Sequence, residues 1–374
     1  MGRWFLMNIN GARKEVYTAE AYVSGKSMDD VKKEFNLTKV IKLGSNENPY
    51  APFPNALEAM EKELLLIGIY PEANFIKLRK TLGEKFNLTA DYIGLGHGVG
   101  GVLETIARLF IESGDEAIVP TQSYRLYREI SKLMGGVVRE VSLDENFTVS
   151  IKNIIKTINP KTKIVWMCNP NNPTGTIVKK EDIDRLLESL PKNAWLVLDE
   201  AYVEFSDKRE LPDVIEYIKN DKHVLCVRTF SKYYGLAGAR IGYVIAAPNV
   251  INGFDTVSEP FNANRIALAG AVECLTSDKE NCANAAKLLI EERERVSKAL
   301  EKENLEVVKS HSNFIFFKVP CDADELGLFL LKRGIIVRPC GGWGYNNHIR
   351  VTVGKREEMD EFLEGVKEGL KIFK

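Results

Sequence analysis

Short, fully apolar runs alternate along the chain with longer stretches in which apolar residues recur every three or four positions. The apolar runs lie at residues 117–119, 164–167, 195–198, 224–227 and 242–246. None of them contains a charged residue, which is typical of strands that are buried on both faces of a parallel sheet. The stretches between them, such as residues 181–190, have the spacing of helices with one apolar face. The alternation predicts an α/β fold with a doubly wound, mostly parallel sheet over about residues 50–250.

The last third of the chain has a different pattern. A long charged helix is expected over residues 279–303, followed by two strand-like runs at 313–319 and 348–353 and a final helix with one apolar face. This order indicates a smaller α+β domain after the sheet domain. We therefore predict an N-terminal segment, a large domain and a small C-terminal domain, which comprise residues 1–45, 46–255 and 256–374.

The composition is that of a globular protein of enzyme size. Of 374 residues, 45% are hydrophobic and 28% are charged, and 51 Lys and Arg nearly balance 52 Asp and Glu. A net charge of -1 removes the main sequence argument for a nucleic acid or a membrane surface as partner. The 6 cysteines and 4 histidines are scattered without the spacing of a zinc site, so we expect no metal.

The sequence also lacks the usual signals for export or membrane insertion. The apolar stretch near the N-terminus is too short for a signal peptide. No segment approaches the ~18 consecutive apolar residues that span a bilayer. We therefore expect a cytoplasmic protein.

Three segments that follow predicted strands contain residues suited to bind a cofactor. In TFSKYYGLAGAR, Lys232 can form an imine or bind a phosphate, and Arg240 follows eight positions later. Asp199 in LDEAY stands at the carboxyl end of a strand, where ligand sites of open α/β sheets lie. Asn172 belongs to the rigid loop NPNNPTG. Each segment alone has an ordinary alternative, namely a surface lysine, a helix N-cap and a turn.

In this order, the three segments resemble those of aminotransferases of fold type I, which depend on pyridoxal 5'-phosphate (PLP). The resemblance implies that Lys232 carries the cofactor and moves the proton at the substrate Cα, while Asp199 keeps the pyridine nitrogen protonated. It also implies that Asn172 and Tyr202 bind the phenolic oxygen of the ring. The side chains that it assigns to the cofactor phosphate are Thr229, Ser231 and Arg240.

Two upstream segments fit the same cofactor. The glycine-rich turn LGHGVGG opens a helix, so the resemblance places the phosphate at the backbone N–H groups of Gly98, Val99 and Gly100. Tyr124 in PTQSY occupies the position of the aromatic ring that stacks on the cofactor. The family usually has Ser or Ala and then Asp or Asn at positions 99 and 100, and His97 replaces a usual Asn. We expect the backbone amides to bind the phosphate here.

Over nearly the whole chain the resemblance is closest to the histidinol-phosphate aminotransferase family. The matching stretches include LGSNENP at 43–49, GIIVRP at 334–339 and IRVTVG at 349–354. For the loop at 169–175 the resemblance also implies a cis peptide bond between Asn172 and Pro173.

The same resemblance assigns substrate-binding residues. Arg350 would bind the α-carboxylate of glutamate, and Arg338 would help to hold the phosphate of histidinol phosphate, since guanidinium pairs well with both anions. Tyr22 and Asn48 would also contact the substrate. Tyr70 would reach the cofactor phosphate of a partner subunit, which implies a homodimer with shared active sites.

The implied activity is the PLP-dependent transamination of histidinol phosphate with 2-oxoglutarate or glutamate, a step of histidine biosynthesis. Two alternatives of the same fold stay open. One is an aminotransferase for aromatic amino acids, which the aromatic stretches at 233–234 and 341–345 would suit. The other is a decarboxylase of phosphothreonine type. A third alternative, a non-catalytic cofactor-binding protein, is open because fold does not fix function.

Overall fold

The computed structural model describes residues 10–20, 25–72 and 74–373, and within them the largest sheet has seven strands. Its order is β2-β8-β7-β6-β5-β3-β4. The strands are β2 (Ile93–His97), β3 (Glu116–Pro120), β4 (Val137–Val141), β5 (Thr162–Cys168), β6 (Trp195–Asp199), β7 (Val224–Thr229) and β8 (Ile241–Ile245). All neighbours from β4 to β7 are parallel, whereas β8 is antiparallel to both β7 and β2.

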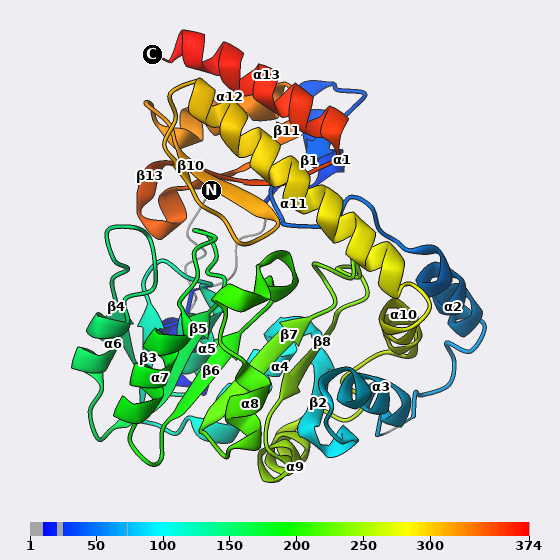
Figure 1. Ribbon diagram of the computed structural model, residues 1–374, viewed down its shortest axis with the longest axis vertical. Helices are drawn as coiled ribbons and strands as arrows, with labels where there is room; N and C mark the ends of the chain where they lie inside the picture. The colour runs from blue at the N-terminus through cyan, green and yellow to red at the C-terminus, as the bar shows by residue number, and fades with distance from the viewer. Residues whose placement is uncertain (1–9, 21–24, 73, 374) are drawn as a thin grey trace.

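Helices cover both faces of this sheet (Figure 1). One face packs against α4 (Gly98–Phe110), α5 (Leu126–Leu133) and α9 (Pro248–Val257). The other packs against α2 (Pro54–Leu64), α3 (Ile76–Phe86), α6 (Ile151–Thr157), α7 (Lys180–Ser189), α8 (Val214–Lys219) and α10 (Arg265–Leu275). Successive strand residues such as Val165 and Trp166 enter opposite cores. This arrangement explains why the strands are apolar throughout rather than alternating.

A second, antiparallel sheet forms the upper part of the molecule in Figure 1, with the order β12-β13-β10-β9. Its strands are β9 (Val307–Val308), β10 (Phe314–Lys318), β12 (Arg338–Cys340) and β13 (Tyr345–Thr352). The helices that pack against it are α11 (Lys279–Lys302), α12 (Ala323–Lys332) and α13 (Arg356–Ile372). We call this part the small domain.

The N-terminal region joins the small domain. After α1 (Met28–Phe35), β1 (Ile41–Lys42) pairs in parallel with β11 (Ile335–Ile336). The described residues also contain 3-10 helices, which are η1 (Lys14–Tyr17), η2 (Ala90–Tyr92), η3 (Val203–Phe205), η4 (Lys208–Glu210) and η5 (Gly341–Trp343). The division at residues 45 and 255 stays a prediction.

The predicted fold class is confirmed, and the differences lie in individual strands. All five apolar runs are strands, but β8 is antiparallel, a direction that burial alone does not predict. The edge strand β4 has no apolar run, because Val137, Arg139 and Glu140 are exposed. No helix in the described ranges has the length and hydrophobicity to cross a bilayer. Nor do the described His, Cys, Asp and Glu side chains gather in a group that could hold a metal ion.

Candidate active site

Asp199 ends β6 as a buried carboxylate with two hydrogen-bond donors. The hydroxyl of Tyr127 donates to Oδ2 at 2.7 Å, and the backbone N–H of Ala201 donates to Oδ1 at 3.1 Å. Burial raises the pKa of Asp199 to about 6, although both donors stabilise its ionised form. The carboxylate is therefore mostly charged at neutral pH but held in surroundings of low polarity, where its interaction with a nearby cation is strong.

Lys232 lies just beyond the end of β7 and points towards the N-terminal region. Its Nζ donates to the carbonyl oxygen of Ser45 at 2.9 Å. Burial, together with the positive charge of Arg350, lowers the pKa of the Lys232 amine to about 8. Roughly one tenth of such an amine is neutral at pH 7, far more than for an ordinary lysine. A nucleophilic lysine requires this neutral form.

A hydrogen-bonded group connects the loops after β5 and β6 with the small domain. The hydroxyl of Tyr202 accepts from Nδ2 of Asn46 at 3.1 Å and from Nδ2 of Asn172 at 3.4 Å. Arg350 donates from Nη1 to Oδ1 of Asn172 and from Nη2 to the Gly44 carbonyl, both at 2.6 Å. Burial raises the pKa of Tyr202 well above its usual value, so the hydroxyl keeps its proton. With two bonds accepted, Tyr202 is left to act as a donor.

The residues predicted to bind phosphate converge at the start of α4. Gly98 has a left-handed φ of 65°, and a Cβ there would collide with the guanidinium of Arg240. Arg240 itself has a φ of 60°, a strained conformation for a residue with a side chain. The N-cap residue His97 makes no side-chain cap, so the first-turn N–H groups of Val99 and Gly100 remain available to an anion.

Thr229 and Ser231 lie beside this turn, at the end of β7. Thr229 pairs with Gly242 of β8, and a Cβ at Gly242 would lie 2.7 Å from the backbone of Gly98. The backbone N–H of Ser231 donates to Oγ1 of Thr229 at 3.0 Å. Two hydroxyls, one guanidinium and the helix N-terminus thus gather at one place, which is the donor set a phosphate requires.

Tyr124 and Asn48 contact residues beside Asp199 and Lys232, whereas Tyr70 does not. The ring of Tyr124 contacts that of Tyr127 edge-on at 5.5 Å, next to Asp199. Asn48 donates from Nδ2 to the backbone carbonyl of Tyr233 at 3.0 Å. Tyr70 is 76% exposed and stacks on the ring of Phe261.

The two predicted substrate arginines are neighbours. Arg338 of β12 and Arg350 of β13 are directly opposite each other in the antiparallel pair. Tyr22 lies outside the described residues. The peptide bond between Asn172 and Pro173 is cis, as expected.

The sequence profile of class I and II aminotransferases matches residues 38–366. The chain belongs to this family. Among its relatives, the histidinol-phosphate aminotransferase of Caldicellulosiruptor saccharolyticus is 38% identical and aligns with 96% of this chain and 99% of its own. The enzyme of the same name from Moorella thermoacetica is 34% identical, with 95% and 92% covered.

Solved structures agree with this assignment. The histidinol-phosphate aminotransferase of Sinorhizobium meliloti, solved in complex with PLP, has a TM-score of 0.89 at 25% identity, with 97% of this chain and 98% of that chain covered. The L-threonine-O-3-phosphate decarboxylase of Porphyromonas gingivalis has a TM-score of 0.77 at 22% identity, with 89% and 100% covered, which shows a shared fold alone. The predictions of an enzyme, of an aminotransferase and of PLP as its cofactor are confirmed.

The donor set of this aminotransferase fits PLP. The cofactor's aldehyde requires a neutral amine, and the pKa of Lys232 is lowered to about 8. Its pyridine nitrogen requires a carboxylate, which the buried side chain of Asp199 supplies. Its phosphate requires N–H groups and a cation, which the turn at Gly98 and the side chain of Arg240 supply.

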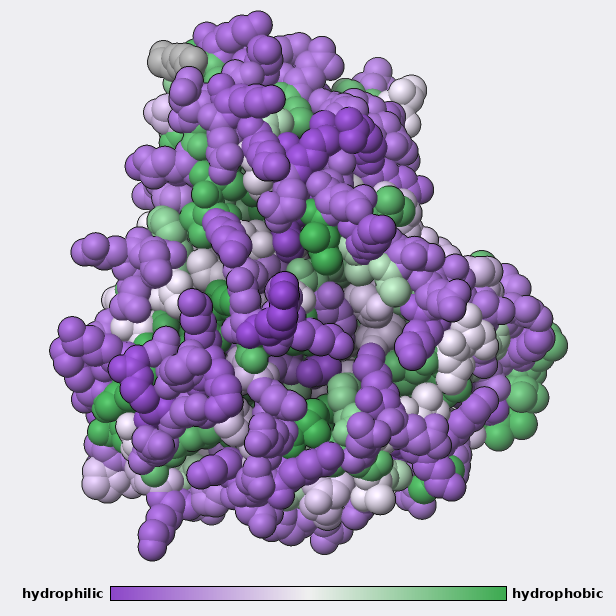
Figure 2. All heavy atoms as spheres, in the orientation of Figure 1, coloured by the Kyte–Doolittle hydropathy of each residue, from purple (hydrophilic) through white to green (hydrophobic). Residues whose placement is uncertain are grey.

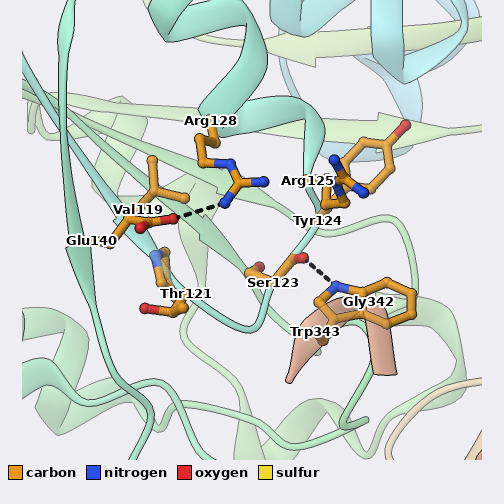
Figure 3. A pocket seen from close by; sticks show the side chains of 10 residues that line it. Val119, Thr121, Ser123, Tyr124, Arg125, Arg128, Glu140, Gly342 and Trp343 are labelled. Atoms are coloured by element: carbon orange, nitrogen blue, oxygen red, sulfur yellow. Dashed lines mark hydrogen bonds and ion pairs between the residues drawn. The ribbon is translucent and has the colours of Figure 1, made fainter. Parts of the chain in front are cut away.

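Three residues of the aminotransferase site were not among the predicted ones. Asn46 belongs to the matching stretch at 43–49 and adopts a left-handed φ of 56°, which Asn tolerates better than most residues. Tyr127 lies in the first turn of α5, three positions after Tyr124, and its hydroxyl reaches Asp199. Trp343 comes from a turn of the small domain and donates from Nε1 to the carbonyl oxygen of Ser123 at 2.8 Å (Figure 3).

Proposed function

We propose that this aminotransferase transfers an amino group from histidinol phosphate to 2-oxoglutarate, with glutamate as the product. The observation that carries the proposal is the pair of adjacent guanidinium groups, Arg338 and Arg350. A phosphate dianion can accept hydrogen bonds from both, and so can the carboxylates of the second substrate. The names of the relatives support the same substrate.

In the proposed reaction the chain's own residues bind the substrate and move one proton. Bound PLP supplies an electron sink that stabilises negative charge at the substrate Cα. The neutral amine of Lys232 would remove the proton from the substrate Cα and would return it at C4′ of the cofactor. Asp199 would hold the proton of the pyridine nitrogen, and the hydroxyl of Tyr202 would donate to the phenolic oxygen. Arg350 fixes the amide of Asn172 by binding its Oδ1, which leaves Nδ2 facing the hydroxyl of Tyr202.

A panel of amine donors tests the proposed substrate. We expect kcat/KM for histidinol phosphate to exceed that for phenylalanine, tyrosine and unphosphorylated histidinol by about 10- to 100-fold, because a charge-assisted hydrogen bond contributes about 1.5–3 kcal/mol. Steady-state rates with 2-oxoglutarate as acceptor measure this. A higher kcat/KM for phenylalanine would favour an aromatic aminotransferase. Release of carbon dioxide from phosphothreonine without any keto acid would favour the decarboxylase.

We also propose that the enzyme is a homodimer in which Tyr70 reaches the partner's cofactor phosphate. The segment at the end of α2 and after it exposes a run of apolar side chains, of which Leu65 is the most exposed, at 88%. Figure 2 shows this apolar surface at the right edge of the molecule, where Figure 1 places the connection between α2 and α3. Its members are Leu64, Leu65, Leu66, Ile67, Ile69 and Tyr70. Such a patch is typical of a subunit interface.

Charges placed in this apolar segment are expected to dissociate the dimer. The double substitution Leu65→Glu and Ile69→Glu would bury two unpaired carboxylates, which costs several kcal/mol per ion. Sedimentation velocity is expected to show a dimer for the wild-type enzyme and a monomer for the variant. Leu328→Glu on α12, where the side chain is also about half exposed, is the matched control and should remain dimeric. A monomeric wild-type enzyme that is fully active would contradict the proposal.

The proposed location is the cytoplasm. All six cysteines are free thiols, five of them buried, and they form no disulfide. Such cysteines suit a reducing compartment.

A further inference from the structure

Trp343 lies close to both substrate arginines. It ends η5, the turn that joins β12 to β13. The centre of its indole ring lies 5.7 Å from the guanidinium carbon of Arg338 and 5.8 Å from that of Arg350. Both distances are within the range of a cation–π interaction, for which tryptophan is the best of the aromatic side chains.

The two arginines need such a neighbour. Like charges directly opposite each other on antiparallel strands are destabilising, and Arg338 and Arg350 are such a pair. Arg350 is partly compensated by the oxygens of Asn172 and Gly44. Arg338 makes no ion pair with any carboxylate in the described ranges. The ring of Trp343 therefore supplies the negative surface that Arg338 shares with Arg350.

The ring itself is held from the opposite side. Its Nε1 donates to the carbonyl oxygen of Ser123, and Figure 3 shows the indole below this oxygen with its nitrogen facing it. The hydroxyl of Ser123 donates to Oδ1 of Asn171 at 2.8 Å, next to Asn172. The indole is thus fixed between the loop that carries Tyr124 and the strands that carry the arginines.

We propose that Trp343 is a positioning residue that determines specificity for a phosphorylated amine. Its ring holds the guanidinium of Arg338 beside that of Arg350, so that both can bind one phosphate dianion. A substrate without a phosphate makes fewer hydrogen bonds with the guanidinium groups of Arg338 and Arg350. The inference rests on the proposed function. It adds that the preference for a phosphorylated amine depends on the aromatic ring of Trp343.

The test compares histidinol phosphate with histidinol in wild-type enzyme and in Trp343→Leu. We expect the ratio of the two kcat/KM values to fall by about 5- to 30-fold in the variant, mostly through a higher KM for histidinol phosphate, given the strength of a partly desolvated cation–π contact. Trp343→Phe keeps an aromatic face and should retain most of the ratio. Trp343→Met, which has no ring and a flexible side chain that fills irregular gaps, replaces the leucine variant should that variant not fold.

Two controls separate positioning from general damage. Trp195→Leu removes an indole at the far end of β6, where it stacks on His223 at 4.4 Å, and should leave the ratio within about twofold. In an Arg338→Leu background, Trp343→Leu should lower the ratio little further, because the two residues act together. An unchanged ratio in Trp343→Leu overturns the role of Trp343. A wild-type enzyme with no preference for histidinol phosphate contradicts the proposed substrate instead, and this role with it.

Discussion

Replacing Lys232 with alanine is expected to abolish transamination while the fold stays intact. The amine would be the group that carries the cofactor and moves the proton at Cα, and alanine has no group that can do either. General acid–base catalysis alone contributes about 10²- to 10⁴-fold, and the covalent role adds to it, so kcat should fall by about 10⁴-fold or more. Steady-state rates with histidinol phosphate and 2-oxoglutarate measure the loss.

The control for this substitution is another lysine. Lys62 lies on α2 in an exposed ion pair with Glu58, so Lys62→Ala should keep full activity. Circular dichroism should show the same secondary structure and cooperative unfolding for both variants, because the substitution removes one side-chain hydrogen bond, to the carbonyl oxygen of Ser45, and leaves the backbone unchanged. Full activity of Lys232→Ala would refute its assignment as the catalytic lysine.

Much of the site was predictable because the parallel sheet places it. Asp199 and Thr229 each end a strand that begins with an apolar run, and the carboxyl ends of neighbouring parallel strands meet at one edge. The loops that follow, with Asn172 and Lys232, must therefore lie close together. Short apolar runs determine the strands, and the strands determine where these residues stand.

Other parts of the site depend on contacts that no local pattern encodes. Asn46 reaches Tyr202 across 156 positions of the chain, and Trp343 reaches Ser123 across 220. Such pairs form only once segments far apart in the sequence have packed together. The direction of β8 is a further case, because an apolar run reports burial and says nothing about the way a strand runs.

Asp199→Asn is expected to lower kcat/KM by about 10²- to 10⁴-fold. Asparagine has nearly the same shape, but it lacks the negative charge that would hold the pyridine nitrogen protonated. Removing one partner of a buried ion pair costs about 3–5 kcal/mol, and each 1.36 kcal/mol is a factor of ten in rate. Tyr127→Phe removes only one hydrogen bond to the same carboxylate, so its loss should stay near tenfold or below.

The same substitution should stabilise the cofactor-free protein, which distinguishes loss of charge from loss of fold. Burial raises the pKa of Asp199 from 3.8 to about 6, so the ionised carboxylate destabilises the folded state. This destabilisation is absent below pH 3.8, grows as the pH rises and is complete above about pH 6. Asp199→Asn removes it, and about 3 kcal/mol of unfolding free energy should be gained at pH 7.5, less at pH 5.

Urea unfolding of the cofactor-free proteins at the two pH values measures this gain. Asp213→Asn is the matched control, because Asp213 caps α8 with its side chain and is remote from the site. Asparagine is nearly as good a cap, so this variant should be close to wild type in both stability and rate. An Asp199→Asn enzyme that is inactive and also less stable at pH 7.5 would mean that the carboxylate contributes to the stability of the folded state. An inactive but more stable variant would mean that the ionised carboxylate of Asp199 lowers the stability of the fold and is kept for its role in catalysis.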